Sequence, residues 1–163
     1  MFKHILLPTD GSELSAAAIR QGILFAKSIR AKVTGVCVMP LHYKFIYATL
    51  IPTESMEESA IQCKELAETF LGTIEDRAEL AKEFAKGYLS TIEKIAREAG
   101  VVCDVIYERN DSPYEGIIRV AEQKGCDLIM MASHGRRGVG ALLLGSETQK
   151  VLTYSKIPVL VYR

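Results

Sequence analysis

The stretch FKHILLPTDGS, residues 2–12, predicts a strand, a turn and the start of a helix. Residues 2–7 are a short apolar run, which stops at the turn-forming residues Pro8-Thr9-Asp10-Gly11. Ser12 suits the N-cap of the helix that follows, since its hydroxyl can accept an amide hydrogen of the first turn. A strand that leads through a short turn into a helix is the unit from which parallel α/β proteins are built.

The same unit recurs along the chain. Short apolar or β-branched runs predict further strands at residues 31–39, 101–108, 126–132 and 159–162. Apolar residues at helical spacing predict helices over 12–29, 56–70, 80–99, 112–124 and 146–154, the fourth of which begins with a capping-box pattern, Ser112-Pro113 with Glu115. This alternation predicts an α/β fold with a parallel sheet and helices on both faces, but it does not give the strand order.

Length and composition indicate one ordinary domain over residues 1–163, with a variable loop or helical insertion at about 40–76. Twenty basic and twenty acidic side chains cancel, so general nucleic-acid binding lacks its electrostatic driving force. No apolar run is long enough for a membrane helix, and the first residues do not resemble a signal peptide. We therefore expect a cytoplasmic protein whose cysteines, Cys37, Cys63, Cys103 and Cys126, are reduced and mostly buried.

The segment MMASHGRRGVGALLLGS, residues 130–146, is the most distinctive loop. Glycines let backbone amides approach an anion closely, and the helix that opens near Gly145 offers unpaired amides to a phosphate. Arg136 and Arg137 would add positive charge. A glycine-rich connection with ordinary helix capping by Ser146 explains the same residues, and the segment matches neither a Walker loop nor a dinucleotide-binding turn.

Three blocks, HILLPTDGS at residue 4, ASHG followed after nine residues by GS, and KIPVLVY near the end, resemble the universal stress protein family. The resemblance implies a Rossmann-like, adenine nucleotide alpha hydrolase-like fold with a five-stranded parallel sheet in the order 3-2-1-4-5. The point where strand order reverses then lies between the first and fourth strands, where such folds bind ligands.

The nucleotide-binding branch of that family has the pattern G-x2-G-x9-G-[ST]. Carried onto this chain, the pattern meets Ala132, Gly135, Gly145 and Ser146, so an alanine replaces the first glycine. An alanine at a position that requires positive φ would cost on the order of 1 kcal/mol or more. The resemblance also implies that the turn at Asp10 lies near the ribose and base, and that the backbone of Val38 meets the adenine edge. The implied nucleotide-binding set is Pro8, Thr9, Asp10, Val38, Ala132, His134, Gly135, Gly145, Ser146, Glu147 and Thr148.

The resemblance implies a stress-response or signalling protein that binds ATP or AMP, together with Mg²⁺ or Mn²⁺ as counter-charge. No residue is an obvious base for water, and His134 lacks a triad partner, so no catalytic residue is assigned and any ATP hydrolysis is expected to be slow. The alternative is a dimeric interaction module without nucleotide, paired through an apolar C-terminal edge strand at 158–162. An adenylyl transferase would need catalytic motifs that the sequence lacks.

Overall fold

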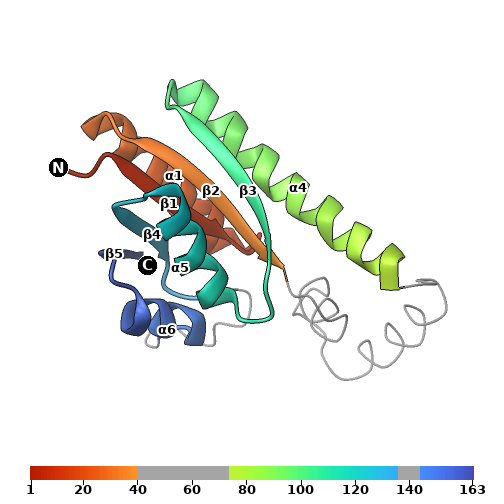
Figure 1. Ribbon diagram of the computed structural model, residues 1–163. Helices are drawn as coiled ribbons and strands as arrows, with labels where there is room; N and C mark the ends of the chain where they lie inside the picture. Colours follow the sequence, from red (N-terminus) through yellow and green to blue (C-terminus); the bar gives the residue numbers. More distant parts are fainter. Residues whose placement is uncertain (40–73, 136–143) are drawn as a thin grey trace.

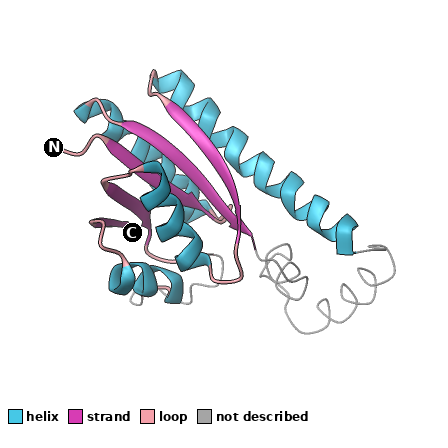
Figure 2. Cartoon of the chain, viewed as in Figure 1, coloured by secondary structure: helices cyan, strands magenta, loops and turns pink. Residues whose placement is uncertain are grey.

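The structure, a computed structural model, describes residues 1–39, 74–135 and 144–163 (Figure 1). Strands and helices alternate along it (Figure 2). In chain order they are β1 (His4–Thr9), α1 (Glu13–Ile29), β2 (Lys32–Met39), α4 (Ile74–Ala99), β3 (Cys103–Arg109), α5 (Pro113–Lys124), β4 (Leu128–Ala132), α6 (Ser146–Tyr154) and β5 (Val159–Tyr162). The predicted helix at 56–70 and most of the insertion at 40–76 lie outside the described residues, while residues 74–76 belong to α4.

The five strands form one parallel sheet in the order β3-β2-β1-β4-β5, which confirms the predicted fold class and strand order. α1 and α4 cover one face of the sheet, and α5 and α6 cover the other (Figure 1). Because β1 lies centrally and β2 and β4 lie on its two sides, consecutive strands diverge there. The carboxyl end of β1 is therefore the switch point of the sheet.

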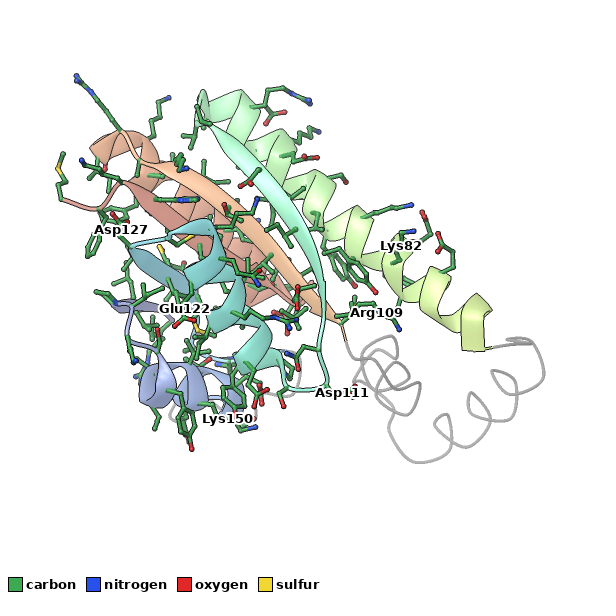
Figure 3. All side chains as sticks on the ribbon, viewed as in Figure 1. Lys82, Arg109, Asp111, Glu122, Asp127 and Lys150 are labelled. Atoms are coloured by element: carbon green, nitrogen blue, oxygen red, sulfur yellow. The ribbon has the colours of Figure 1, made fainter. Side chains whose placement is uncertain are left out.

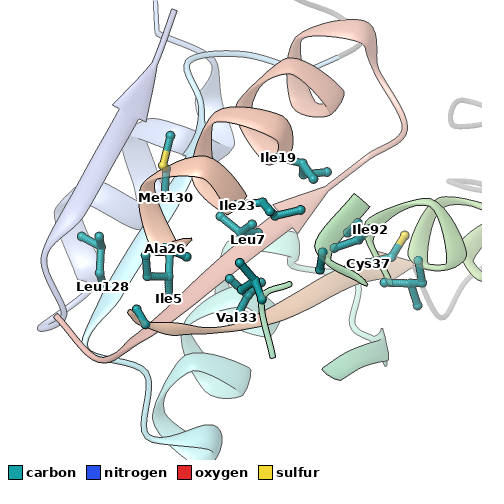
Figure 4. Packing of buried hydrophobic residues seen from close by; sticks show 14 of the residues in the cluster. Ile5, Leu7, Ile19, Ile23, Ala26, Val33, Cys37, Ile92, Leu128 and Met130 are labelled. Atoms are coloured by element: carbon teal, nitrogen blue, oxygen red, sulfur yellow. The ribbon is translucent and has the colours of Figure 1, made fainter. Parts of the chain in front are cut away.

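The core consists of two apolar layers, one on each face of the sheet, because successive strand residues point to opposite faces. Ile5 and Leu7 contact α1 and α4 in the larger layer, drawn in Figure 4. Leu6, between them, packs in the smaller layer under α5 and α6. These three residues are fully buried, and such a side chain contributes about 1.5–3 kcal/mol relative to leaving it exposed.

Two helix starts test the capping predictions. Ser12 is the N-cap of α1, and its hydroxyl accepts the amide hydrogen of Ser15 at 3.2 Å, as predicted. The capping box at Ser112 was a wrong prediction, since the Ser112 side chain makes no capping hydrogen bond. The Glu115 amide donates instead to the Ser112 carbonyl at 3.0 Å, and the Glu115 carboxylate accepts from the Tyr114 hydroxyl at 2.9 Å. β1 also extends through Pro8 and Thr9, which the sequence assigned to the turn.

A line of polar side chains crosses three strands near the amino end of the sheet. His4 Nε2 lies 2.8 Å from Thr34 Oγ1, and the Thr34 hydroxyl donates to Asp104 Oδ1 at 2.5 Å. Lys124 Nζ on α5 donates to the other Asp104 oxygen at 2.8 Å. Since Thr34 has one hydroxyl proton and gives it to a carboxylate, His4 Nε2 must be the donor toward Thr34. His4 Nε2 therefore carries a proton, and burial, which lowers the pKa of His4, favours the neutral Nε2–H form. The buried Nδ1 makes no hydrogen bond within the described part of the chain.

The thiols of Cys103 and Cys126 are not reactive thiolates, and the described helices are not membrane spans. Cys37, Cys103 and Cys126 form no disulfide with one another, and burial raises the pKa of Cys103 and Cys126 to about 11. Both thiols therefore stay protonated near neutral pH. No helix in residues 1–39, 74–135 or 144–163 combines the length and apolar character needed to cross a membrane.

Candidate functional site

The strands β1 and β4 separate before they end, and Pro8 explains why. Backbone groups of alternate β1 residues face β4; the His4 carbonyl, for example, accepts the Asp127 amide hydrogen at 2.9 Å. Pro8 faces the same way but has no N–H to donate. The last residue pair between the two strands is Leu6 with Ile129, two positions before Pro8. The early end of the hydrogen-bonded ladder between β1 and β4 therefore follows from the sequence of β1 itself.

The turn from β1 into α1 is held by its own side chains. Asp10 Oδ1 accepts hydrogen bonds from the Ser12 amide at 3.0 Å and from the Ser12 hydroxyl at 2.7 Å. Thr9 Oγ1 accepts the Gly11 amide hydrogen at 3.1 Å and lies 3.2 Å from Ser15 Oγ. Gly11 adopts φ of +79°, a conformation that disfavours other residues. One carboxylate oxygen of Asp10 is thus fixed by the turn.

The carbonyl of Val38 faces this turn without a partner in the strand ladder. Even-numbered residues of β2 direct their backbone groups toward β1, as Lys32 does when its amide donates to the Lys3 carbonyl at 3.0 Å. β1 ends at Thr9, one register step before Val38. Gly11, the residue whose amide would continue the ladder, donates to the Thr9 hydroxyl instead. Val38 therefore presents a hydrogen-bond acceptor at the carboxyl edge of the sheet.

The loop after β4 is tied to both β5 and α6. The Ser133 amide donates to the Tyr162 carbonyl at 2.7 Å, and the Ser133 carbonyl accepts the Gly145 amide hydrogen at 2.8 Å. The Thr148 hydroxyl, which is buried, donates to the Ala132 carbonyl at 3.0 Å. Any β-carbon on Gly145 would lie 3.1 Å from the His134 Cα, so the glycine allows the two ends of the loop to meet.

Gly135 joins this loop to the turn after β1. A β-carbon placed on Gly135 would lie 2.3 Å from Asp10 Oδ2, which is far inside van der Waals contact. The backbone of the fourth-strand loop therefore rests directly on the Asp10 carboxylate. Two segments that are distant in sequence converge at the switch point, and a β-carbon at position 135 would force the Asp10 carboxylate or the loop to shift.

The start of α6 has the features of an anion-binding helix end. Gly145 is its N-cap, and no side chain caps it. The first amides of a helix have no partner within the helix, and Ser146, the first helical residue, is exposed. The Thr148 side chain points inward, and its hydroxyl donates a hydrogen bond to the Ala132 carbonyl.

The Glu147 carboxylate points away from the loop, toward α5. Its Oε2 accepts the Tyr114 amide hydrogen at 2.9 Å, and its Oε1 accepts from Lys150 Nζ at 2.8 Å. Lys150, which is labelled in Figure 3, also has its Nζ 5.3 Å from the centre of the Tyr114 ring. In this arrangement Glu147 caps α5, whose serine N-cap makes no such bond, and it holds α6 against α5.

Ala132 occupies an ordinary strand conformation. It is the last residue of β4 and is 7% exposed. Among the described non-glycine residues, positive φ occurs at Arg30 alone. The methyl group at the first motif position therefore causes no backbone strain in this structure.

His134 lies beside the site, next to the Ser133 hydroxyl. Its Nδ1 is 3.1 Å from Ser133 Oγ, and it is partly exposed. In the parts of the chain that the structure describes, no group of three or more His, Cys, Asp or Glu side chains is placed to hold a metal ion. Arg136 and Arg137 lie outside the described residues.

The sequence analysis missed two contacts at this site. Tyr88 lies in the helix that apolar spacing predicted over 80–99, and its ring lies against Gly11 in the β1–α1 turn. Glu147 was assigned to the ligand through the resemblance, yet its carboxylate binds α5. Both contacts join residues far apart in the chain, so helical spacing carried no signal for either.

Comparison with known proteins identifies close relatives over the full length. The model of the universal stress protein family matches residues 1–163. Universal stress protein MJ0577 of Methanocaldococcus jannaschii is 31% identical over 175 residues, which cover 100% of this chain and 96% of the relative. Universal stress protein YxiE of Bacillus subtilis is 31% identical over 170 residues and 100% of both chains.

Solved structures agree with the sheet order. The structure of MJ0577 superposes with a TM-score of 0.70 at 29% identity and covers 99% of this chain and 95% of its own. Two more distant structures share the fold: a universal stress protein in complex with cAMP, with a TM-score of 0.61, and one from Archaeoglobus fulgidus in complex with dAMP, with a TM-score of 0.59. The fold, the two loops that meet at the switch point and these matches show that the chain belongs to the universal stress protein family.

Proposed function

We propose that this chain binds an adenine nucleotide, ATP or AMP, at the carboxyl end of its sheet and acts as a stress-response or signalling binding protein. The observation that carries the proposal is the contact of the Gly135 backbone with the Asp10 carboxylate, because it brings the two candidate loops into one site. The complexes of family members with cAMP and dAMP support an adenine nucleotide as the ligand.

Each part of the site suits a different part of the nucleotide. The open N-terminus of α6, with Gly145 and Ser146, offers amides and a hydroxyl to phosphate. Asp10 offers a carboxylate oxygen to ribose hydroxyls. The Val38 carbonyl is an acceptor, so it favours a base with an exocyclic amino group over one with a carbonyl there. Glycine at positions 135 and 145 keeps the backbone between these groups free of β-carbons.

A divalent cation, Mg²⁺ or Mn²⁺, would supply counter-charge to the phosphates when bound. We propose that it binds chiefly through phosphate oxygens and water, as Mg²⁺ commonly does, because the described chain offers no cluster of three acidic, His or Cys ligands. The chain's own residues bind and orient the nucleotide in this proposal, and none is assigned as a base for hydrolysis.

Calorimetric titration of the purified protein with ATP, AMP and inosine triphosphate, with and without Mg²⁺ or Mn²⁺, tests the proposal. ATP at one hundred times Kd should stabilise the fold by about 2.7 kcal/mol in thermal unfolding. Inosine triphosphate lacks the amino donor for Val38, so we expect roughly tenfold weaker binding. The absence of any ATP or AMP binding at millimolar concentration would overturn the proposal.

A matched pair of serine variants locates the phosphate end. Ser146→Ala removes the exposed hydroxyl at the start of α6 and should weaken ATP binding by about fivefold, a typical net value for one hydrogen bond. Ser90→Ala removes an exposed serine hydroxyl on α4, which donates to the Gly87 carbonyl, and should leave the affinity unchanged. Equal effects of the two variants would contradict this placement.

A second function, interaction between two copies of the chain, is supported by the edge strand β5. β5 pairs with β4 on one side, and its Leu160 is 43% exposed. An exposed apolar edge strand can pair with its symmetry mate, so we propose a homodimer through residues 158–162. Leu160→Lys should shift a dimer toward monomer in analytical ultracentrifugation, whereas Leu24→Lys, at a more exposed leucine of α1, should not. A monomeric parent protein would overturn this candidate.

A further inference from the structure

The ring of Tyr88 on α4 occupies the space beside Gly11 in the β1–α1 turn. A β-carbon placed on Gly11 would lie 2.2 Å from Tyr88 Cζ, 2.4 Å from Cε1 and 2.7 Å from Cε2. The outer end of the ring, which bears the hydroxyl, therefore contacts the turn. With φ of +79°, Gly11 exposes a bare Cα against which the flat ring packs.

This contact closes the remaining side of a short turn. Thr9 binds the Gly11 amide from within the turn, and Ser12 binds one oxygen of Asp10. Those bonds set the local shape of the turn but do not fix where it stands relative to the rest of the fold. Gly135 contacts the turn from the loop after β4, and Tyr88 adds a second contact from α4, which packs on the same face of the sheet as α1.

The position of Tyr88 on α4 differs from that of an ordinary core residue. Ala85 and Leu89, beside it in sequence, are buried in the core on this face, while Tyr88 is half-buried at its margin. Phe84, one turn earlier, is 41% exposed. The tyrosine ring is thus aimed at the turn rather than at the centre of the apolar layer.

We infer that Tyr88 is a positioning residue of the nucleotide site, whose ring clamps the β1–α1 turn and thereby fixes the Asp10 carboxylate for the ribose hydroxyls. The inference rests on the proposed function and extends it to a residue on α4 that does not itself have to contact the ligand. A carboxylate already held in place binds a hydroxyl without first losing conformational freedom, so loosening the turn should cost affinity.

The test compares ATP with 2′,3′-dideoxy-ATP, which lacks the hydroxyls that Asp10 would bind. Tyr88→Leu removes the ring, and Tyr88→Phe keeps it. We expect Tyr88→Leu to weaken ATP binding about tenfold and dideoxy-ATP binding by less than about threefold, since a hydrogen bond to a charged group accounts for roughly this difference. Tyr88→Phe should bind both ligands as the parent does, and so should the control Phe84→Leu on the same helix.

The outcomes separate this inference from the proposed function. A parent protein that binds neither ATP nor AMP would overturn the proposed function and the inference with it. A parent that binds ATP, with a Tyr88→Leu variant that loses both ligands equally or neither, would overturn the inference alone. Thermal unfolding shows whether each variant is folded, and Tyr88→Met, which fills similar space without a flat ring, replaces Tyr88→Leu if that variant does not fold.

Discussion

The polar line His4-Thr34-Asp104 predicts a pH dependence of stability that a single substitution should abolish. Burial is the largest cause that lowers the pKa of His4, and the Lys32 charge adds to it, against the opposing effects of the Asp104 carboxylate, the Lys124 backbone and the Asp127 carboxylate. The folded protein therefore resists protonation of His4.

The sign of the effect follows from the proton count. The folded pKa of His4 lies below the ordinary value of 6.5, so the unfolded chain binds more protons between these two pKa values. The free energy of unfolding contributed by His4 is fully present above pH 6.5 and is lost as the pH falls toward the folded pKa. For one proton the slope approaches about 1.4 kcal/mol per pH unit in that window.

His4→Gln isolates this contribution, because a glutamine amide can donate to Thr34 from a position near Nε2 and does not titrate. We expect urea unfolding of the parent to show the decline below pH 6.5 and the variant to lack that part of it. The Asp104 and Asp127 carboxyls titrate in another range, since hydrogen bonds, from Lys124 and Thr34 to the first and from the backbone to the second, outweigh burial and lower the pKa of each.

A second variant tests the hydrogen bonds themselves. Thr34→Val keeps the shape of the side chain but leaves the buried His4 Nε2–H without its acceptor, which should cost about 2 kcal/mol. Parallel pH profiles for the parent and His4→Gln, or a Thr34→Val variant as stable as the parent, would refute the reasoning.

Three further predictions concern the loops and α6. Gly135→Ala should weaken ATP binding by roughly tenfold or more in calorimetry, because its β-carbon would meet the Asp10 carboxylate and such overpacking costs about 1–3 kcal/mol. Unchanged affinity would show that the two loops can move apart without loss of binding. Ala132→Gly should change affinity by less than about threefold and lower stability by about 0.5–1 kcal/mol, since the position needs no positive φ; a large gain in affinity would mean that the methyl group obstructs the ligand. Glu147→Gln should lower the free energy of unfolding by about 0.5–1 kcal/mol, because a negative charge is lost from the start of α5 at Tyr114. It should leave the ATP affinity unchanged. A changed ATP affinity with unchanged stability would place the Glu147 carboxylate at the phosphate instead.

Local patterns predicted the elements of this fold well. Each strand coincides with a run that the sequence marked as apolar or β-branched, and α1 follows the Ser12 cap that the sequence indicates. α4 begins at Ile74, before the predicted start at residue 80. The strand order came from the family resemblance, because periodicity describes one element at a time and not its neighbours. The residues of the two loops were likewise identified before their contact at Gly135 was known.

Contacts between distant elements could not be predicted from local sequence patterns. The helix start at Ser112 has the letters of a capping box, but a carboxylate from α6 takes the neighbouring amide, so a local rule gave the wrong partner. His4 read as one residue of an apolar strand, and its bonds to Thr34 and Asp104 depend on the register of three strands. Such hydrogen bonds depend on which distant strands become neighbours in the fold. A pattern read over a few neighbouring residues does not contain that information.

Pro8 gives the early end of the ladder between β1 and β4 an unusual permanence. A gap made by a salt bridge or a mobile loop can close when acidity, ionic strength or binding changes, whereas the missing hydrogen of a proline nitrogen is a covalent fact of the chain. The early end of the β1–β4 ladder is therefore set by the covalent structure of the chain, and no change of pH or salt can supply the missing hydrogen bond.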